Sequence, residues 1–388
     1  MRGILHSEKE YILSSLDSEV QVIIVGAGKH CEKILAYLAE KNIQVSEIFD
    51  NDEKKHGTCL NKIKITKPYK AEGKTAYIIT PRDGLVRDGL RAQLMALGIK
   101  DEDILDYDMA VYKYMEKLPE SKYQNWLDEE FSEIFGYRMD WNKPVTYNEK
   151  LNWEKVHVRS ALRTKVVDKY RVREYIKDKL GEEYLNELYG VYDDASEIDF
   201  DKLPQQFVLK LNNGSSRNIV VKDKNTLDIA KTRAQLNRWK KINHAYTCLE
   251  MQYKDVPPKI ICEKFIPGMA ESLYDYQFYC FHGKPKYIWC IKAIHKENCQ
   301  ASFYDTDWKK QEFTFGYPGD PELAPCPKQL EKMLKISEIL SADFKHVRVD
   351  LYELPDGRIL FGELTLTSWG GFHKFVPEKY DKVLGELI

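Results

Sequence analysis

The segment that most constrains the fold is HVRVDLYELPDGRILFGELTLT, residues 346–367. Two runs of alternating apolar and polar residues flank Asp356 and Gly357, a pair typical of two-residue hairpin turns. Counting back from this turn predicts three pairs on one face of the hairpin: Tyr352 with Phe361, Asp350 with Glu363, and Arg348 with Thr365. Val349 and Leu364 then point to the other face. The sequence therefore predicts an antiparallel hairpin with two carboxylates directly opposed.

Opposed carboxylates repel each other, so a fold needs a cation to compensate them. A hard divalent ion held by oxygen atoms is the natural compensation, and Asp350 and Glu363 are the predicted ligands. Arg348 adds a fixed positive charge of the kind that stabilises a transferring phosphoryl group. The alternative is a solvated strand face with charges placed by chance, and a one-residue register slip would also separate the pair. The apolar opposite face argues against a hairpin exposed on both sides.

Two further segments carry candidate binding groups. Residues 207–222, FVLKLNNGSSRNIVVK, predict two strands joined by a Gly and Ser loop, where backbone N–H groups could approach a phosphate and Lys210 could neutralise it. The segment lacks the Walker pattern, and an ordinary hairpin turn is the alternative. Residues 260–266, IICEKFI, predict a buried strand with Glu263 near its end. Such a strand could present backbone groups and a carboxylate to an adenine edge.

The order of predicted elements indicates a multidomain chain of mixed α/β and α+β class. Residues 1–115 alternate strands and helices as in a Rossmann-like parallel sheet, and residues 116–205 are expected to form a helical connector and the start of the module that follows. From 206 to 388, short strands and interposed helices predict a catalytic module.

Composition excludes several classes of protein. The 59 Lys and Arg against 61 Asp and Glu give no basic field for a nucleic-acid backbone. No window approaches the roughly 20 apolar residues of a membrane span, so a soluble cytoplasmic chain is expected. The 8 cysteines are scattered without a CxxC pair, which favours reduced thiols over disulfides or a zinc site. The sequence does not indicate an oligomeric state.

From about Asn148 to the C-terminus the chain resembles the ATP-grasp superfamily, specifically the TupA-like ATP-grasp family linked to bacterial surface polysaccharides and teichuronopeptide. The motifs that carry the resemblance are NEKLNW at 148–153, VVDKY at 166–170, FVLK with the NNGSS loop, EKF at 263–265, and the closing VRVDLY and FGELT segments. The resemblance implies an ATP-grasp module that uses ATP and Mg²⁺.

The resemblance also implies roles for individual residues. Lys169 and Lys210 are similar to the two lysines that hold ATP phosphates, and Arg348 and Lys210 are the expected catalytic cations. The remaining positions are Gly214, Ser215 and Ser216 in the loop over the phosphates, Glu263 with the Phe265 and Ile266 backbone at the adenine, Glu271 or Asp275 at the ribose, and Asp350 and Glu363 at the metal. Thr365 stands where many relatives have a metal-binding Asn, and Ser368–Gly371 replaces a Pro-Gly turn.

The resemblance implies an ADP-forming ligase that couples a sugar acid or nucleotide-linked uronic acid to an amino acid or amine through an acyl phosphate, in capsule or cell-wall polysaccharide synthesis. A phosphotransferase and a nucleotide-binding scaffold without turnover are alternatives. A glycosyltransferase is a weaker one, because the two lysines and the glycine loop argue against it.

The front of the chain offers a weaker pattern. Residues 26–34, GAGKHCEKI, contain GxG without a third glycine, and Asp50 follows at a predicted strand end. This part looks like the small Rossmann-like domain at the front of some bacterial sugar acyltransferases, which can hold a nucleotide sugar. A purely structural domain is the alternative. Gly26, Gly28 and Asp50 are the residues that would distinguish the two.

Overall fold

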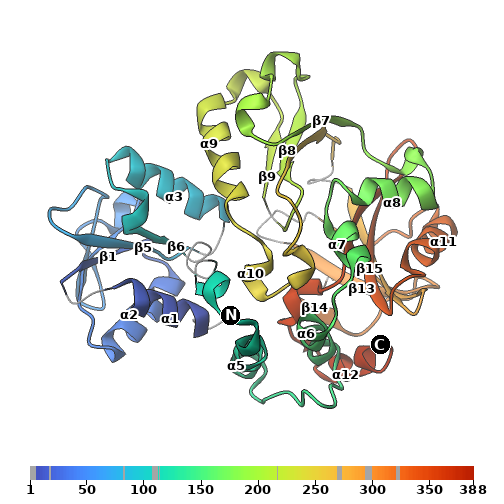
Figure 1. The fold of residues 1–388 in the computed structure, drawn as a ribbon, viewed down its shortest axis with the longest axis horizontal. Coiled ribbons are helices and arrows are strands. Elements are labelled where there is room, and N and C mark those ends of the chain that lie inside the picture. Colours follow the sequence, from blue (N-terminus) through green and yellow to red (C-terminus); the bar gives the residue numbers. More distant parts are fainter. Residues whose placement is uncertain are drawn as a thin grey trace. The chain divides into compact units, whose positions relative to one another are not determined.

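The computed structural model describes residues 6–16, 19–81, 84–106, 112, 114–215, 217–268, 273–292, 299–319 and 324–388. The chain divides into two compact units, Met1–Tyr137 and Arg138–Ile388 (Figure 1). The division expected from sequence, 1–115, 116–205 and 206–388, stays a prediction. No helix among the described residues is long and apolar enough to cross a membrane.

The first unit is built on a six-stranded sheet in the order β3-β4-β2-β1-β5-β6. All neighbours are parallel except β3 and β4, and the strand order runs outward from β1 in both directions, as in doubly wound sheets. The elements are α1 (His6–Ser15), β1 (Gln21–Val25), α2 (Lys29–Glu40), β2 (Val45–Phe49), β3 (Cys59–Leu60), β4 (Ile63–Thr66), β5 (Thr75–Ile79), α3 (Gly84–Ala96), β6 (Ile104–Asp106) and α5 (Tyr123–Phe135). The predicted parallel sheet is confirmed.

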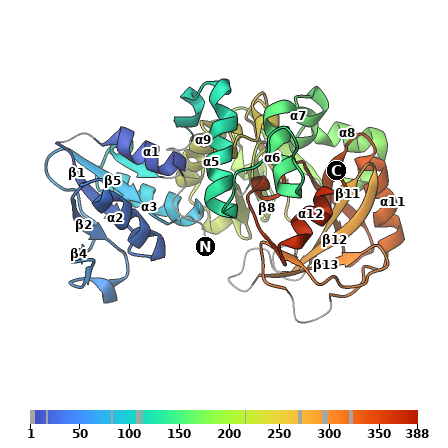
Figure 2. The ribbon, with the colours of Figure 1, turned by 90° about the horizontal axis from the view of Figure 1, so that it is seen from below.

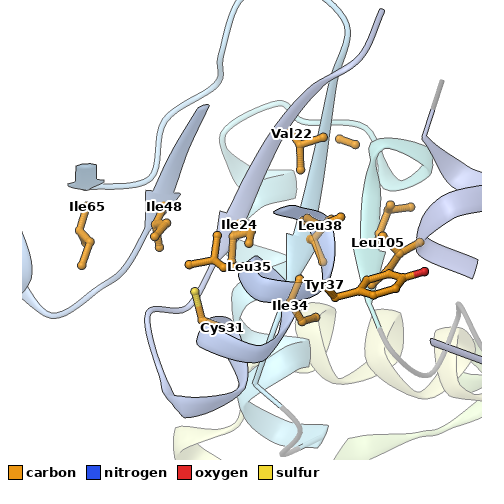
Figure 3. Close-up of a cluster of buried hydrophobic side chains, with 13 residues drawn as sticks. Val22, Ile24, Cys31, Ile34, Leu35, Tyr37, Leu38, Ile48, Ile65 and Leu105 are labelled. Atoms are coloured by element: carbon orange, nitrogen blue, oxygen red, sulfur yellow. The ribbon is translucent and has the colours of Figure 1, made fainter. Parts of the chain in front are cut away.

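Strand β1 is buried on both faces, which is why its sequence, QVIIV, is almost continuously apolar. Val22 and Ile24 pack with Ile34 and Leu38 of α2 (Figure 3). Ile23, from the opposite face of β1, belongs to a second cluster that also includes buried residues of β5 and α3.

Asp50, at the end of β2, is hydrogen-bonded to the turn that follows β1. Asp50 Oδ2 accepts hydrogen bonds from Ala27 N at 2.7 Å and Lys55 Nζ at 3.1 Å, and Oδ1 accepts one from Asp52 N at 2.8 Å. Burial alone would raise the pKa of Asp50, but these donors outweigh it and hold the pKa below its ordinary value. Gly26 has φ +100°, and a Cβ there would lie 2.7 Å from Pro81 Cδ. Gly28 is the N-cap of α2. Whether this turn binds a nucleotide sugar stays a prediction.

The second unit contains two antiparallel sheets. The smaller has the order β7-β10-β8-β9 and packs with α9 around a core that includes Phe207, Leu209 and Trp239. Figure 1 shows these strands beside α9. Its elements are β7 (Leu188–Tyr192), β8 (Phe207–Leu211), β9 (Asn218–Val221), α9 (Ile229–Lys240) and β10 (Ile260–Lys264), preceded by α6 (Tyr147–His157), α7 (Ala161–Val167) and α8 (Val172–Lys179), with α10 (Ala245–Cys248) before β10.

The larger sheet has the order β13-β12-β11-β15-β16. Helix α11 covers one face, and α6 lies beside α12 on the aromatic cluster of the other (Figure 2). The elements are β11 (Tyr274–Phe281), β12 (Lys284–Lys292), β13 (Gln300–Asp305), α11 (Leu330–Ser341), β15 (His346–Glu353), β16 (Ile359–Thr365) and α12 (Lys379–Gly385), with a small sheet of β14 (Thr314–Phe315) and β17 (Phe375–Val376).

The sheet face that packs against α6 is aromatic at one end of the strands and polar farther along. At one end Tyr279 and Trp289 join the aromatic cluster, and further along the same face Gln277 of β11 pairs with Asp350 of β15. The predicted strands of this unit are present, but the segment expected to be a helical connector contains β7, an edge strand that pairs with β10.

We predict that Asp50→Asn destabilises the first unit by about 1–3 kcal/mol, because an amide cannot accept all three bonds that the carboxylate accepts. Thermal unfolding measured by circular dichroism would show it. Asp52→Asn is the matched control, since an amide oxygen can still cap Lys54 N. Equal stability of both variants would contradict the structural role of Asp50.

Candidate active site

The β15–β16 hairpin carries the central charged residues, and its turn and strand pairing differ in part from the predicted ones. The turn has three residues, Pro355–Gly357, because Leu354 N donates to Arg358 O at 2.8 Å, and Gly357 takes φ +84°. Near the turn Tyr352 therefore pairs with Leu360, and its predicted pairing with Phe361 is wrong.

A bulge restores the predicted register farther from the turn. The pairing shifts between Val349 and Leu351, so that Asp350 lies opposite two residues, Gly362 and Glu363. Beyond the bulge, Arg348 pairs with Thr365 and Val349 with Leu364, and both predicted pairs are confirmed. A Cβ on Gly362 would lie 2.9 Å from Tyr352 Cε2 and 3.1 Å from Asp350 O, so the close approach needs glycine.

Arg348 joins the two carboxylates. Its Nε and Nη2 bind Asp350 Oδ1 and Oδ2 at 2.7 and 2.6 Å, and Nη2 also binds Glu363 Oε1 at 3.0 Å. Burial would lower the pKa of Arg348, but the two carboxylates raise it well above its ordinary value. The compensating cation between the opposed carboxylates is thus a guanidinium of the same hairpin, and it uses both oxygens of Asp350.

Strand β11 adds neutral and acidic groups beside this ion pair. Asp275 and Gln277 are buried, and Gln277 Nε2 donates to Asp275 Oδ2 at 2.7 Å. Among the described residues, Asp275 Oδ1 and Gln277 Oε1 have no hydrogen-bond partner. Burial raises the pKa of Asp275 to about 6. Of the two carboxylates expected at the ribose, Asp275 therefore lies inside the sheet face, and Glu271 lies outside the described residues.

Lys169 connects the hairpin to the glycine loop. Its Nζ donates to Gly214 O at 2.7 Å and lies 3.4 Å from Glu363 Oε2. Burial would raise the pKa of Glu363, but Lys169 and Arg348 lower it to about 2, so this carboxylate is ionised at neutral pH. Glu363 is also accessible, with 39% of its side chain exposed. Thr365 Oγ1 donates to Glu363 Oε1 at 3.2 Å.

The glycine loop, 212–217, is anchored to the segment that carries Lys169. Asn212 Nδ2 donates to Asp168 Oδ1 at 2.9 Å, and Lys169 N donates to Asn212 O at 2.9 Å. Gly214 has φ +86°, and a Cβ there would lie 2.7 Å from His244 Cγ. Ser215 is exposed, and Ser216 lies outside the described residues.

Lys210 and Glu263 meet across the smaller sheet. Lys210 pairs with Ile261 of β10, which brings Lys210 Nζ within 2.7 Å of Glu263 Oε2. Arg173 Nη1 lies 3.7 Å from Glu263 Oε1. Phe265 and the buried Ile266 follow β10 directly. The structure thus brings together Lys169 with Gly214 and Glu363, and separately Lys210 with Glu263.

Helix α6, which contains the whole NEKLNW motif, supports the turn that follows β16. Asn152 Nδ2 donates to Gly371 O at 2.7 Å, Asn148 Nδ2 to His373 O at 2.9 Å, and the buried Lys155 Nζ to Gly370 O. Trp369 and Gly370 both adopt positive φ there. These side chains therefore hold the backbone carbonyl groups of the turn in place.

Oxygen donors suited to Mg²⁺ gather around Glu363. Hard cations of this size are commonly held by one or two carboxylates together with substrate phosphates. Glu363 is ionised and accessible, and Asp275 Oδ1 and Gln277 Oε1 face the same network as buried oxygens. Within the described ranges no group of three His, Cys, Asp or Glu could hold a metal by itself. The residues fit a Mg²⁺ that is shared with phosphate oxygens.

Sequence reasoning missed a polar network behind the site. Thr367 Oγ1 donates to Glu250 Oε1 and accepts from Gln252 Nε2 at 2.8 Å, and His244 Nε2 lies 3.3 Å from Glu250 Oε2. These residues come from segments distant in the chain. Only their burial distinguishes these residues from other polar residues, and the burial of a single polar residue cannot be predicted from the sequence.

Comparison with protein families gives one match. A family model described as TupA-like ATPgrasp matches residues 149–388. A search of curated proteins finds no match.

Three similar solved structures are ligases or ATP-grasp proteins by their names. An L-amino acid ligase from Bacillus licheniformis is 12% identical over 92% of this chain and 70% of its own, with a TM-score of 0.34. N5-carboxyaminoimidazole synthase from Aspergillus clavatus is 12% identical over 89% and 70%, with a TM-score of 0.31. A RimK domain ATP-grasp protein from Sphaerobacter thermophilus is 11% identical over 95% and 99%, with a TM-score of 0.31. Similarity this low supports no inference about activity.

We predict that Asp275→Asn stabilises the protein at pH 7.5 by about 2–3 kcal/mol and much less at pH 4.5. A carboxyl whose pKa is about 6 when folded and about 3.9 when unfolded binds its proton more tightly in the folded state. The free energy of unfolding therefore falls as the pH rises from about 4 to about 6, and the amide removes this loss.

Urea unfolding of both proteins at the two pH values, without Mg²⁺, measures the effect. Asp381, whose pKa is also raised to about 6 by burial, titrates in both proteins and cancels in the difference. A difference that does not depend on pH would contradict the raised pKa of Asp275.

Proposed function

The chain belongs to the TupA-like ATP-grasp family, and from this premise we propose that it is an ADP-forming ligase that joins a carboxylate to an amine through an acyl phosphate. The observation that carries the proposal is the convergence of Lys169, Arg348 and the ionised Glu363 beside a glycine loop. Two cations and one accessible carboxylate are groups that would stabilise a transferring phosphoryl group and hold its metal.

In the proposed reaction an oxygen of the substrate carboxylate attacks the γ-phosphorus of ATP, and the bond to the ADP oxygen breaks. The amine then attacks the carbonyl carbon of the acyl phosphate, loses a proton and releases phosphate. Mg²⁺, when bound, neutralises charge on the phosphate oxygens. Neither step needs a covalent bond to the protein, so the chain acts by positioning and by electrostatics.

Each charged residue has a proposed task. Glu363, whose side chain is 39% exposed, would hold the metal, with the Thr365 hydroxyl as a weaker neighbour. Arg348 faces the charge that develops on the transferring phosphoryl group. Asp350 was predicted as a second metal ligand. We propose that it also fixes Arg348, because both of its oxygens bind that guanidinium.

The nucleotide would lie between the two sheets of the second unit. Lys169 and Lys210 are the proposed phosphate contacts, with the loop Gly214, Ser215 and Ser216 above them. Glu263 and the backbone of Phe265 and Ile266 are proposed at the adenine. At the ribose, Glu271 is the better candidate, because Asp275 is only 3% exposed.

The proposed carboxylate is a sugar acid or nucleotide-linked uronic acid, and the amine an amino acid or related amine, in bacterial capsule or cell-wall polysaccharide synthesis. This narrower statement rests on the resemblance to a family linked to bacterial surface polysaccharides, of which the matched family model covers residues 149–388. A phosphotransferase would use the same charges but leave the phosphate on its acceptor.

The proposal predicts that Mg-ATP, hydroxylamine and the correct uronic acid or nucleotide uronate give ADP, phosphate and a hydroxamate. Phosphorus NMR of the purified protein with a panel of such acids measures the first two, and iron complexation measures the third. AMP with pyrophosphate would contradict an acyl phosphate. A phosphorylated acceptor that resists hydroxylamine would favour the phosphotransferase.

In the same assay, Asp350→Asn and Glu363→Gln should each lower hydroxamate formation roughly 100-fold, because each removes a charge from the Arg348 network. Asp356→Asn, at the exposed turn of the same hairpin, is the matched control and should keep the wild-type rate. Circular dichroism checks that the variants fold. Wild-type rates in both site variants would contradict the assignment.

A further inference from the structure

A cavity of about 400 Å³ lies between the α6–α7 turn and the segment Met251–Asp255. Its volume is within the range of small-ligand sites. Its polar lining consists of Arg159, Ser160, Arg163, Thr164, Arg171 and Gln252, together with Asp255. None of the motifs singled out in the sequence covers the arginines at 159 and 163.

The cavity carries an excess of positive charge. Three guanidinium groups line it against one carboxylate, Asp255. Arg163 Nη2 is paired with Glu154 Oε2 at 2.8 Å, but its Nε is buried with no hydrogen-bond partner among the described residues. An unpaired buried donor costs free energy that a bound acceptor would recover. Planar guanidinium groups match the oxygens of phosphate in pairs.

The walls of this arginine pocket are continuous with the candidate site. Gln252 Nε2 donates to Thr367 Oγ1 at 2.8 Å, and Thr367 lies two residues after the end of β16. On the other wall, Arg171 is two residues from Lys169, whose Nζ contacts Glu363. Helix α7, between Arg159 and Arg171, contacts β16 as well. The pocket is therefore built on segments that neighbour those carrying Lys169 and Glu363.

We propose that the arginine pocket binds the phosphate group of a phosphorylated uronic acid while the carboxylate of the same molecule lies near Glu363. This inference rests on the proposed function and names the substrate class more closely. A single carboxylate has two oxygens and pairs with one guanidinium, whereas a phosphate offers enough oxygens for both Arg159 and Arg171, the two lining arginines other than the one paired with Glu154. The phosphate could belong to a sugar 1-phosphate or to the diphosphate of a nucleotide sugar.

The test compares binding of glucuronate and glucuronate 1-phosphate by isothermal titration calorimetry, with Mg²⁺ and a non-hydrolysable ATP analogue present. The wild-type chain should bind the phosphate ester at least about tenfold more tightly. Arg159→Gln and Arg171→Gln should each reduce this preference to within about threefold. Both arginines are exposed, so the fold should persist. A nucleotide diphosphate uronate as third ligand shows which source of phosphate binds better.

Arg358→Gln is the matched control, because Arg358 is an exposed arginine of the same unit that pairs with Asp356 outside the pocket. It should keep the wild-type preference. Equal affinity of the wild-type chain for the free acid and for both phosphate-bearing ligands would overturn the proposal. So would a preference that survives in both pocket variants.

A titration with Mg-ATP on the same samples separates this proposal from the proposed function. If the wild-type chain does not bind Mg-ATP but still prefers the phosphate ester, the proposed ligase function is contradicted and the proposed phosphate binding by the arginine pocket is supported. Normal Mg-ATP binding without any preference would overturn the arginine pocket alone.

Discussion

The second unit depends on one buried cation. A guanidinium removed from water is costly unless its hydrogen bonds and charge are matched. Arg348 meets this condition with Asp350 on its own strand and Glu363 on the neighbouring strand. The match exists only because the bulge at Gly362 places Glu363 beside it. The charge of Arg348 is therefore balanced only in this register of the hairpin.

Other parts of the unit converge on this hairpin. Lys169 brings the glycine loop to Glu363 through Gly214 O, and α6 fixes the turn after β16 through Asn152 and Lys155. The smaller sheet contributes a separate pair, Lys210 with Glu263. A ligand that bridges the two groups would interact with charges from both sheets. This is the physical reason to place a nucleotide there.

The sequence predicted those parts of the hairpin that depend on alternation. Pairing of Arg348 with Thr365 follows from polar and apolar residues in register, and it is confirmed. The three-residue turn was not predictable, because an Asp-Gly pair suits more than one type of turn. The bulge was not predictable either, because the need for glycine at 362 arises from its close contact with Tyr352 in the folded hairpin. The two deviations cancel, which is why the distant pairs are still correct.

Contacts between segments that are distant in the sequence could not be predicted from the hydrophobic pattern or the motifs. Strand β7 is short and lies in a helical region, and only its pairing with β10 makes it a strand. Asp50 matched a weak nucleotide-binding spacing, yet in the structure it accepts hydrogen bonds from Asp52 N and Lys55 Nζ just after it and from Ala27 N, 23 residues earlier. The Thr367, Glu250 and His244 network joins segments more than a hundred residues apart. Such burial and pairing follow from the tertiary fold.

The central claim is that a substrate carboxylate attacks the γ-phosphorus of ATP in this site. The most direct measurement uses a uronic acid labelled with ¹⁸O in its carboxylate, turned over with Mg-ATP and an amine. The account predicts that the released phosphate carries one ¹⁸O from each carboxylate consumed, because that oxygen bridges carbon and phosphorus in the acyl phosphate. Label found in AMP, or phosphate without label while the amide forms, would contradict it.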